Sequence, residues 1–155
     1  MYAALKAIHV IAVILFMGNI ITGVFWKMHA DGSHDPRIIA HTLAGVMRSD
    51  RWFTLPGILL IIAAGVGTAM IGHLPILHTP WILQALLLFI FSGVLFGSRV
   101  APLQKQLYTL ANAAAEGQTM DWDRYRALSK QWGLWGALAT LAPAVAVVLM
   151  VVKPS

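Results

Sequence analysis

The chain has 155 residues, of which 59% are hydrophobic and 11% are charged, and its mean hydropathy is +0.75. A soluble domain carries about 25% charged residues, so the composition excludes an ordinary soluble domain and indicates one membrane domain over residues 1–155. Cysteine is absent, which excludes disulfides, thiolate metal ligands and cysteine nucleophiles. The net charge of +5 comes from scattered basic residues without a basic tract, so we expect no nucleic-acid partner.

Four apolar segments are long enough to cross a bilayer. A helix of roughly 20 apolar residues spans about 30 Å of hydrocarbon. We expect spans at about residues 3–26, 52–72, 81–100 and 132–152. Because the connections between them are short, the sequence predicts an all-α, antiparallel four-helix bundle in contact with the lipid bilayer.

The first and third connections are more polar than the second and are expected to contain further helices. In the first, Asp35 is placed to cap a short helix that begins at Pro36, ends near Met47 and lies in the membrane interface. In the third, residues 104–115 and 122–131 are expected to form helical extensions of the neighbouring spans, separated by a break at Gly117.

Basic residues are distributed unequally between the two sides of the predicted bundle. The side that holds both termini carries only Lys6 and Lys153 of the eleven lysines and arginines. The other nine lie on the side of the first and third connections. By the positive-inside rule, these connections are cytoplasmic and both termini lie outside.

His9 is the main candidate for a functional residue, because it is an ionisable side chain among the apolar residues of the first span. His73 and His78 flank the turn between the second and third spans, at the same outer side of the bundle. Neutral imidazole is a common ligand of copper, zinc and haem iron. Three histidines at one depth therefore suggest a metal or haem site at the outer mouth of the bundle.

Haem and a bare metal ion make different demands on such a site. Haem needs one or two axial ligands, an apolar slot with aromatic walls, and cations for its propionates. Aromatic side chains such as Trp81, and the cations Lys6 and Lys153 at the side of His9, favour haem b. A copper or zinc site would use His9, His73 and His78 together, as in a metal-handling transport protein.

A third interpretation needs no cofactor. His9 would then be a packed residue bonded to a backbone carbonyl, and the protein would be a structural partner of another membrane complex. Polar residues elsewhere in the spans, such as Asn19 and Ser92, are explained by hydrogen bonds between helices. Small residues at four-residue spacing in the second span, among them Gly57 and Gly65, suit either packing within the bundle or a homodimer.

Several segments carry a resemblance to a known family. LKAIHVIAVILFMGN at Leu5–Asn19, RWFTLPGILLIIAAGVGTAM at Arg51–Met70, the third span from Trp81, and LAPAVAVVLMVVKP at Leu141–Pro154 resemble the bacterial predicted integral membrane proteins numbered 2269 among domains of unknown function. The resemblance implies a multi-pass protein of the bacterial cytoplasmic membrane. It leaves open an enzymatic role and a membrane redox partner.

That family is in turn distantly similar to HemJ-type protoporphyrinogen oxidases and CopD-type copper-resistance proteins. HemJ-type proteins are four-span proteins that bind b-type haem, with a histidine early in span one and a lysine-proline pair at the end of span four. His9 and Lys153-Pro154 match those positions, and Gln84 stands where the family has a lysine of span three. The resemblance therefore implies haem binding by His9 with Lys6, Trp81, Gln84 and Lys153 nearby, without the oxidase activity.

Overall fold

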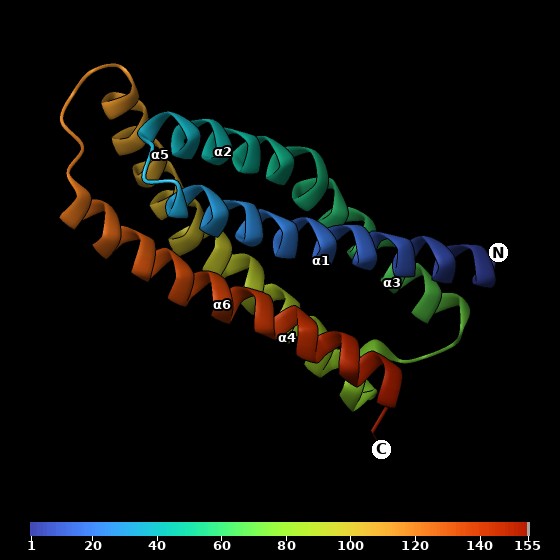
Figure 1. The fold of residues 1–155 in the computed structure, drawn as a ribbon. Coiled ribbons are helices and arrows are strands. Elements are labelled where there is room, and N and C mark those ends of the chain that lie inside the picture. The colour runs from blue at the N-terminus through green and yellow to red at the C-terminus, as the bar shows by residue number, and fades with distance from the viewer. Residues whose placement is uncertain (155) are drawn as a thin grey trace.

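The computed structural model of the chain describes residues 1–154, which form helices joined by short connections (Figure 1). Two of its four long helices are uninterrupted, and each of the other two contains one π-helical turn, η1 or η3. In chain order the elements are α1 (Tyr2–Gly32), α2 (Pro36–Ser49), η1 (Asp50–Thr54), α3 (Leu55–Ile71), the short 3₁₀ turn η2 (Ile76–His78), α4 (Pro80–Leu95), η3 (Phe96–Val100), α5 (Ala101–Ala115) and α6 (Trp122–Val152).

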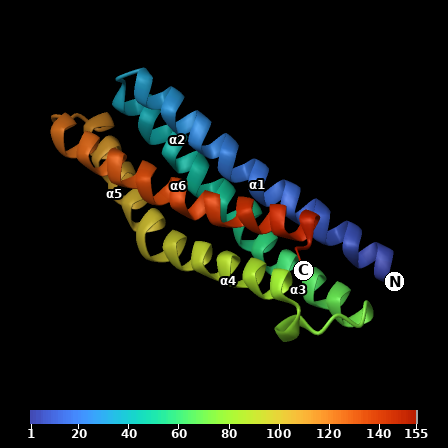
Figure 2. The same ribbon diagram turned by 90° about the horizontal axis from the view of Figure 1, so that it is seen from below.

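The four long helices run antiparallel, so both termini lie at one end of the bundle, as Figures 1 and 2 show. We call this the terminal end, which also holds residues 72–79. The opposite end, with residues 33–35 and 116–121, is the loop end. Each long helix is apolar enough and long enough to cross a membrane, which confirms the four predicted spans of an integral membrane protein in contact with the bilayer.

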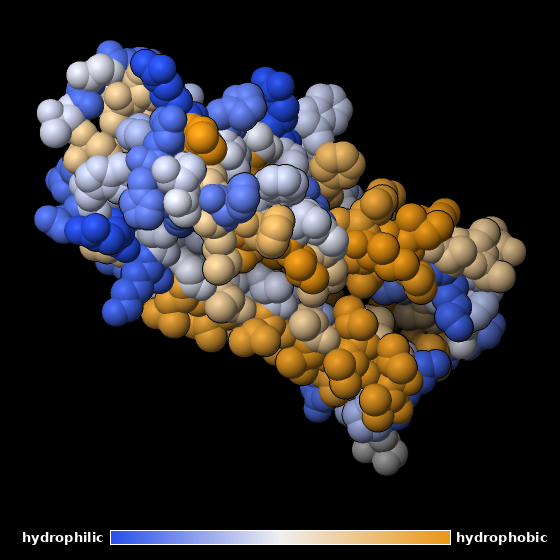
Figure 3. Space-filling view, viewed as in Figure 1, coloured by the Kyte–Doolittle hydropathy of each residue, from blue (hydrophilic) through white to orange (hydrophobic). Residues whose placement is uncertain are grey.

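The helices are much longer than the predicted spans. They contain 31 or 36 residues, or roughly 46 to 54 Å at 1.5 Å per residue, against about 30 Å of hydrocarbon. Hydrophilic residues gather at the loop end and hydrophobic ones over the terminal half (Figure 3). The polar helix turns in excess of a membrane span therefore lie at the loop end of the bundle.

The predicted short interfacial helix in the first connection is wrong. Asp35 does cap a helix that begins at Pro36, accepting a hydrogen bond from the Arg37 backbone N–H at 2.8 Å. That helix does not end near Met47 but continues through η1 into α3. Its apolar side chains Ile39 and Leu43 are buried in the bundle core, so α2 packs against other helices and does not lie along the membrane surface.

The helical extensions predicted in the third connection are confirmed. α5 ends at Ala115, and Gly117 follows with a φ of +105°, a backbone conformation that glycine adopts without strain. α6 then begins at Trp122, capped by the Asp121 carboxylate, which accepts from the Arg124 backbone N–H at 3.0 Å.

Each π-helical turn ends two residues before a proline, Pro56 after η1 and Pro102 after η3. Proline cannot donate a backbone hydrogen bond, and its ring clashes with the carbonyl four residues earlier in a regular α-helix. In both helices that carbonyl belongs to the π-helical turn, whose wider backbone accommodates the proline without ending the helix. Pro102 therefore does not separate the third span from its extension.

Packing differs between the two ends of the bundle. Toward the loop end, side chains from all four long helices meet in one core that includes Ile39, Leu43, Leu107 and Trp132. Toward the terminal end, α1 packs along α3 and α4 packs along α6, and these two pairs diverge (Figure 1). The tilted contact of the Phe16 and Phe89 rings, with 5.5 Å between their centroids, bridges the pairs where they begin to separate.

Candidate functional site

His9 lies on α1, half-buried against α3. Its Nδ1 is 2.9 Å from the Ile61 carbonyl oxygen, and because a carbonyl only accepts, Nδ1 carries the proton. A neutral ring in this tautomer leaves Nε2 unprotonated, as an acceptor or a metal ligand.

The other predicted haem-contacting residues lie at the terminal end on different helices. Lys6 is exposed on α1, and Gln84 is exposed on α4. The Lys153 ammonium at the end of α6 lies 5.6 Å from the centroid of the Trp81 ring on α4, in a cation–π contact. His9 and Lys6 thus belong to the α1–α3 pair, and the other three residues belong to the α4–α6 pair.

His73 and His78 are exposed in the connection between α3 and α4. Within residues 1–154, no three side chains of the types His, Cys, Asp and Glu come together as a metal ion would require. The three histidines proposed as metal ligands are therefore not gathered at one point in the structure.

A polar network that includes Asp50 occupies the middle of the bundle. The Asp50 carboxylate accepts from the Asn19 amide at 3.2 Å and the Thr54 hydroxyl at 3.0 Å, both on one oxygen. Its other oxygen accepts from the Gln104 amide at 3.2 Å. Asn19 also donates to Thr54 at 2.9 Å. Three helices thus supply neutral donors to a single carboxylate.

Trp132 on α6 fixes the orientation of the Gln104 side-chain amide. The Trp132 indole N–H lies 3.3 Å from the Gln104 side-chain oxygen, and an indole can only donate. The Gln104 oxygen therefore faces Trp132, and its amino group faces Asp50. The Asp50 carboxylate thus accepts hydrogen bonds from three neutral groups, an arrangement that suits its ionised form.

Asp50 has no cationic partner among residues 1–154, where the ion pairs are Lys27–Asp31 and Arg126–Asp123. Even a half-buried carboxylate without an ion-pair partner is costly in a membrane protein, which makes Asp50 a candidate functional residue.

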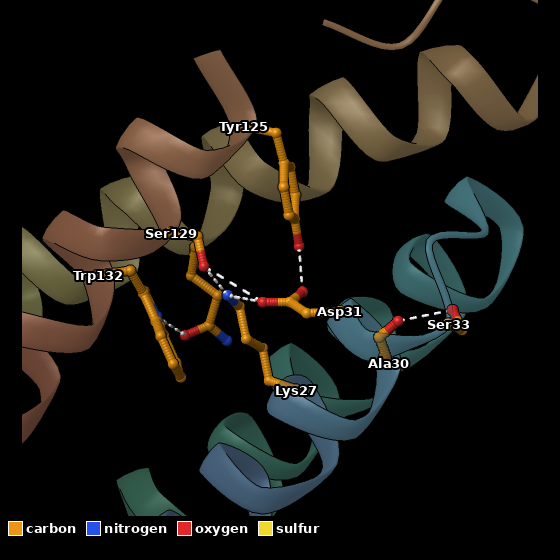
Figure 4. Close-up of polar contacts among 8 residues, drawn as sticks. Lys27, Ala30, Asp31, Ser33, Tyr125, Ser129 and Trp132 are labelled. Atoms are coloured by element: carbon orange, nitrogen blue, oxygen red, sulfur yellow. Dashed lines mark hydrogen bonds and ion pairs between the residues drawn. The ribbon is translucent and has the colours of Figure 1, made fainter. Parts of the chain in front are cut away.

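Lys27 belongs to a second network nearer the loop end, shown in Figure 4. Its ammonium contacts the Asp31 carboxylate at 2.5 Å and the Ser129 hydroxyl, and only 2% of the residue is exposed. Asp31 also accepts from the Tyr125 hydroxyl at 2.6 Å. The ammonium lies 5.1 Å from the Trp132 ring centroid, so Trp132 contacts both networks. Because the polar groups of this network are paired with one another, we assign it a structural role in holding α1 against α6.

A cavity of about 140 Å³ lies beside the Asp50 network, between the two π-helical turns. Asp50 and Thr54 of η1 line it on one side, and Phe96 and Val100 of η3 line it on another. Nearly all the remaining wall is apolar and comes from the four long helices. His9 is not part of this wall.

Asp50 was not among the site residues predicted from the sequence. Two features of the sequence could have indicated Asp50. Thr54 follows it by four residues, about one helical turn, and Pro56 comes two residues after Thr54. Asn19 was correctly expected to bond between helices, and Ser92 does so through the Ala139 carbonyl at 2.5 Å. Only the fold brings Gln104 and Trp132 to the same place.

Comparison with known proteins gives a family without a known function. No curated protein and no solved structure matches the chain. A family model described as "Predicted integral membrane protein (DUF2269)" matches residues 3–154. Together with the four membrane-spanning helices, this match shows that the chain belongs to the DUF2269 family of predicted integral membrane proteins.

Proposed function

We propose that the protein binds haem b in the terminal half of the bundle, with Nε2 of His9 as an axial ligand. The observation that carries the proposal is the 2.9 Å hydrogen bond from His9 Nδ1 to the Ile61 carbonyl. A histidine that ligates a metal usually donates its other ring N–H to a carbonyl or carboxylate, which sets the tautomer and orients the ring. His9 has this arrangement before any ligand is present.

The surroundings of His9 agree with the needs of a porphyrin. The proposed position of the macrocycle is between the α1–α3 and α4–α6 pairs, which diverge toward the terminal end (Figure 1). Lys6 and Lys153 supply cations at that end for the propionates, and Trp81 and Gln84 belong to the facing helix pair. When bound, haem supplies a one-electron redox centre, while the protein provides the ligand and the apolar surroundings.

The resemblance to HemJ-type proteins expected from the sequence agrees with the same ligand. His9 and Lys153-Pro154 stand at the positions of the family's span-one histidine and terminal lysine-proline pair. Gln84 replaces the span-three lysine, so the proposal covers haem binding in electron transfer or haem handling and does not extend to protoporphyrinogen oxidation.

We further propose that the loop end is cytoplasmic in the bacterial inner membrane and that both termini are periplasmic. Nine of the eleven lysines and arginines lie toward the loop end, which supports this orientation. These are Lys27, Arg37, Arg48, Arg51, Arg99, Lys105, Arg124, Arg126 and Lys130.

Absorption spectroscopy of the full-length protein in detergent tests haem binding. After expression with ample haem precursor, wild type and the exposed-histidine control His73→Ala should show a Soret band and reduced α and β bands. His9→Ala should lack them, and His9→Gln, which can still bond to Ile61, should lack them while remaining folded by circular dichroism. A colourless wild type, or a full spectrum in both His9 variants, would contradict the proposal.

A role without a cofactor is the second candidate. The same His9–Ile61 bond ties α1 to α3, which is the behaviour of a packing residue in a structural partner of a membrane complex. In that case wild type carries neither porphyrin nor metal, and His9→Ala lowers thermal stability without any spectral change. Copper or zinc found by elemental analysis without porphyrin absorption would favour metal handling.

A further inference from the structure

We propose that the cavity beside Asp50 binds a small organic monocation, about the size of one aromatic ring, with its positive charge toward the Asp50 carboxylate. This site is separate from the proposed haem site. A cavity of about 140 Å³ is too small for a porphyrin, and His9 does not line it. The inference therefore holds or fails independently of haem binding.

The charge of the ligand follows from Asp50. Its carboxylate accepts hydrogen bonds from Asn19, Thr54 and Gln104, and it has no ion pair within residues 1–154. Neutral donors stabilise an ionised carboxylate, but they leave its net negative charge uncompensated in the bundle. A cation in the adjacent cavity would compensate that charge.

The residues that line the cavity favour an organic cation over an inorganic one. Hard cations such as Na⁺ or Ca²⁺ need several oxygen ligands. The cavity offers a single carboxylate, and the Gln104 oxygen is turned away toward Trp132. Aromatic rings of Phe16, Phe89 and Phe96 line the rest of the space, which suits an alkylated ammonium group through apolar and cation–π contacts.

The size of the ligand follows from the volume. An apolar protein cavity of about 150 Å³ takes up benzene, so about 140 Å³ accommodates one aromatic ring or a branched alkyl group.

The route into the cavity runs from the bilayer. Ile62 on α3 and Ile90 on α4 line the cavity and are themselves exposed. Within residues 1–154, α3 and α4 do not pack along one another, so the opening between them faces lipid. The ligand is therefore an amphipathic cation that partitions into membranes.

Cyclohexylammonium is the probe that tests this inference, because it is positively charged at neutral pH and is close to one aromatic ring in size. Methylcyclohexane, in which a methyl group replaces the ammonium group, is its neutral counterpart. Equilibrium dialysis against the full-length protein in detergent should give one saturable site for the cation. Affinity for the neutral compound should be at least tenfold weaker, since it gains nothing from the carboxylate.

Three variants separate the contribution of the Asp50 charge to cation binding from that of the cavity volume. Asp50→Asn removes the carboxylate and should weaken cation binding about a hundredfold, the usual effect of removing a desolvated charge partner. Asp123→Asn removes an equal charge from a carboxylate that is 95% exposed and should leave binding unchanged. Gly136→Leu adds a side chain to the cavity wall on α6, where an added Cβ meets no atom within 4 Å, and should abolish binding.

The opposite pattern would overturn the inference. Equal binding of the charged and neutral compounds, or cation binding that persists in both Asp50→Asn and Gly136→Leu, would mean that the cavity does not select a cation. No saturable binding to folded wild type would exclude this ligand class. Because Gly136→Leu replaces glycine in a helix by a good helix former, loss of binding there cannot be attributed to a weakened helix.

Discussion

The His9 imidazole lies directly over Gly65, where a Cβ atom would come within 3.0 Å of both Nδ1 and Cε1 of the ring. Only a residue without a side chain leaves this space, so α3 accepts the ring at Gly65 and holds it through the Ile61 carbonyl one turn earlier. A glycine that sequence reasoning assigns to helix packing thus determines where the histidine sits.

Gly65→Ala should therefore displace the His9 ring. A contact of 3.0 Å is tighter than most Cβ contacts, so the imidazole should move by a few tenths of an ångström, which weakens its bond to Ile61. If His9 ligates haem, the reduced spectrum should change in band position or occupancy. Gly133→Ala, whose added Cβ meets nothing within 4 Å, is the control and should give the wild-type spectrum. Identical spectra for wild type and Gly65→Ala would argue against His9 as a ligand.

Gln104→Met should destabilise the protein by about 1–3 kcal/mol, because it leaves the Trp132 indole N–H without an acceptor and removes the donor to one oxygen of the Asp50 carboxylate. Gln104 is 3% exposed, so water cannot readily replace it. Thermal or denaturant unfolding in detergent measures the change. Gln106→Met, at an exposed position of the same helix, should unfold like wild type. Equal stabilities of the two variants would show that the network contributes little.

Lys27→Met should cost about 3 kcal/mol, since it leaves the Asp31 carboxylate without its counter-charge. Ser129 and Tyr125 would still donate to Asp31, which limits the loss. Lys130→Met, at an exposed position of α6, is the matched control and should have little effect. The double variant Lys27→Met/Asp31→Leu should be more stable than Lys27→Met alone if the unpaired carboxylate is the cause.

Single cysteine variants test the orientation in the membrane, and the absence of native cysteine makes the labelling unambiguous. Gln118→Cys places a thiol at the loop end, and Leu77→Cys places one in the connection between α3 and α4, both at exposed positions. In intact cells, a membrane-impermeant maleimide should label Leu77→Cys and spare Gln118→Cys until the membrane is broken. The reverse pattern would invert the topology.

The helix ends at Asp35, Gly117 and Asp121 were more predictable from the sequence than the polar contacts in the middle of the bundle. Asp35 and Asp121 act as helix caps, and Gly117 ends a helix, because these effects depend on neighbours within a few residues. The first connection was misread because Asp50 also looks like a cap by local rules. Its side chain instead bonds to Asn19, 31 residues away, and to Gln104, 54 residues away, and the helix continues past it.

The amino-acid sequence by itself determined that this is a four-span helical membrane protein, because apolar length and composition are local properties that only a bilayer satisfies. The tertiary structure alone decided which polar groups meet. Two π-helical turns at the same depth of antiparallel helices place Asp50 beside a cavity, and the packing of α1 on α3 sets the partner of His9. Such encounters depend on contacts between residues distant in the chain, which hydropathy and spacing do not encode.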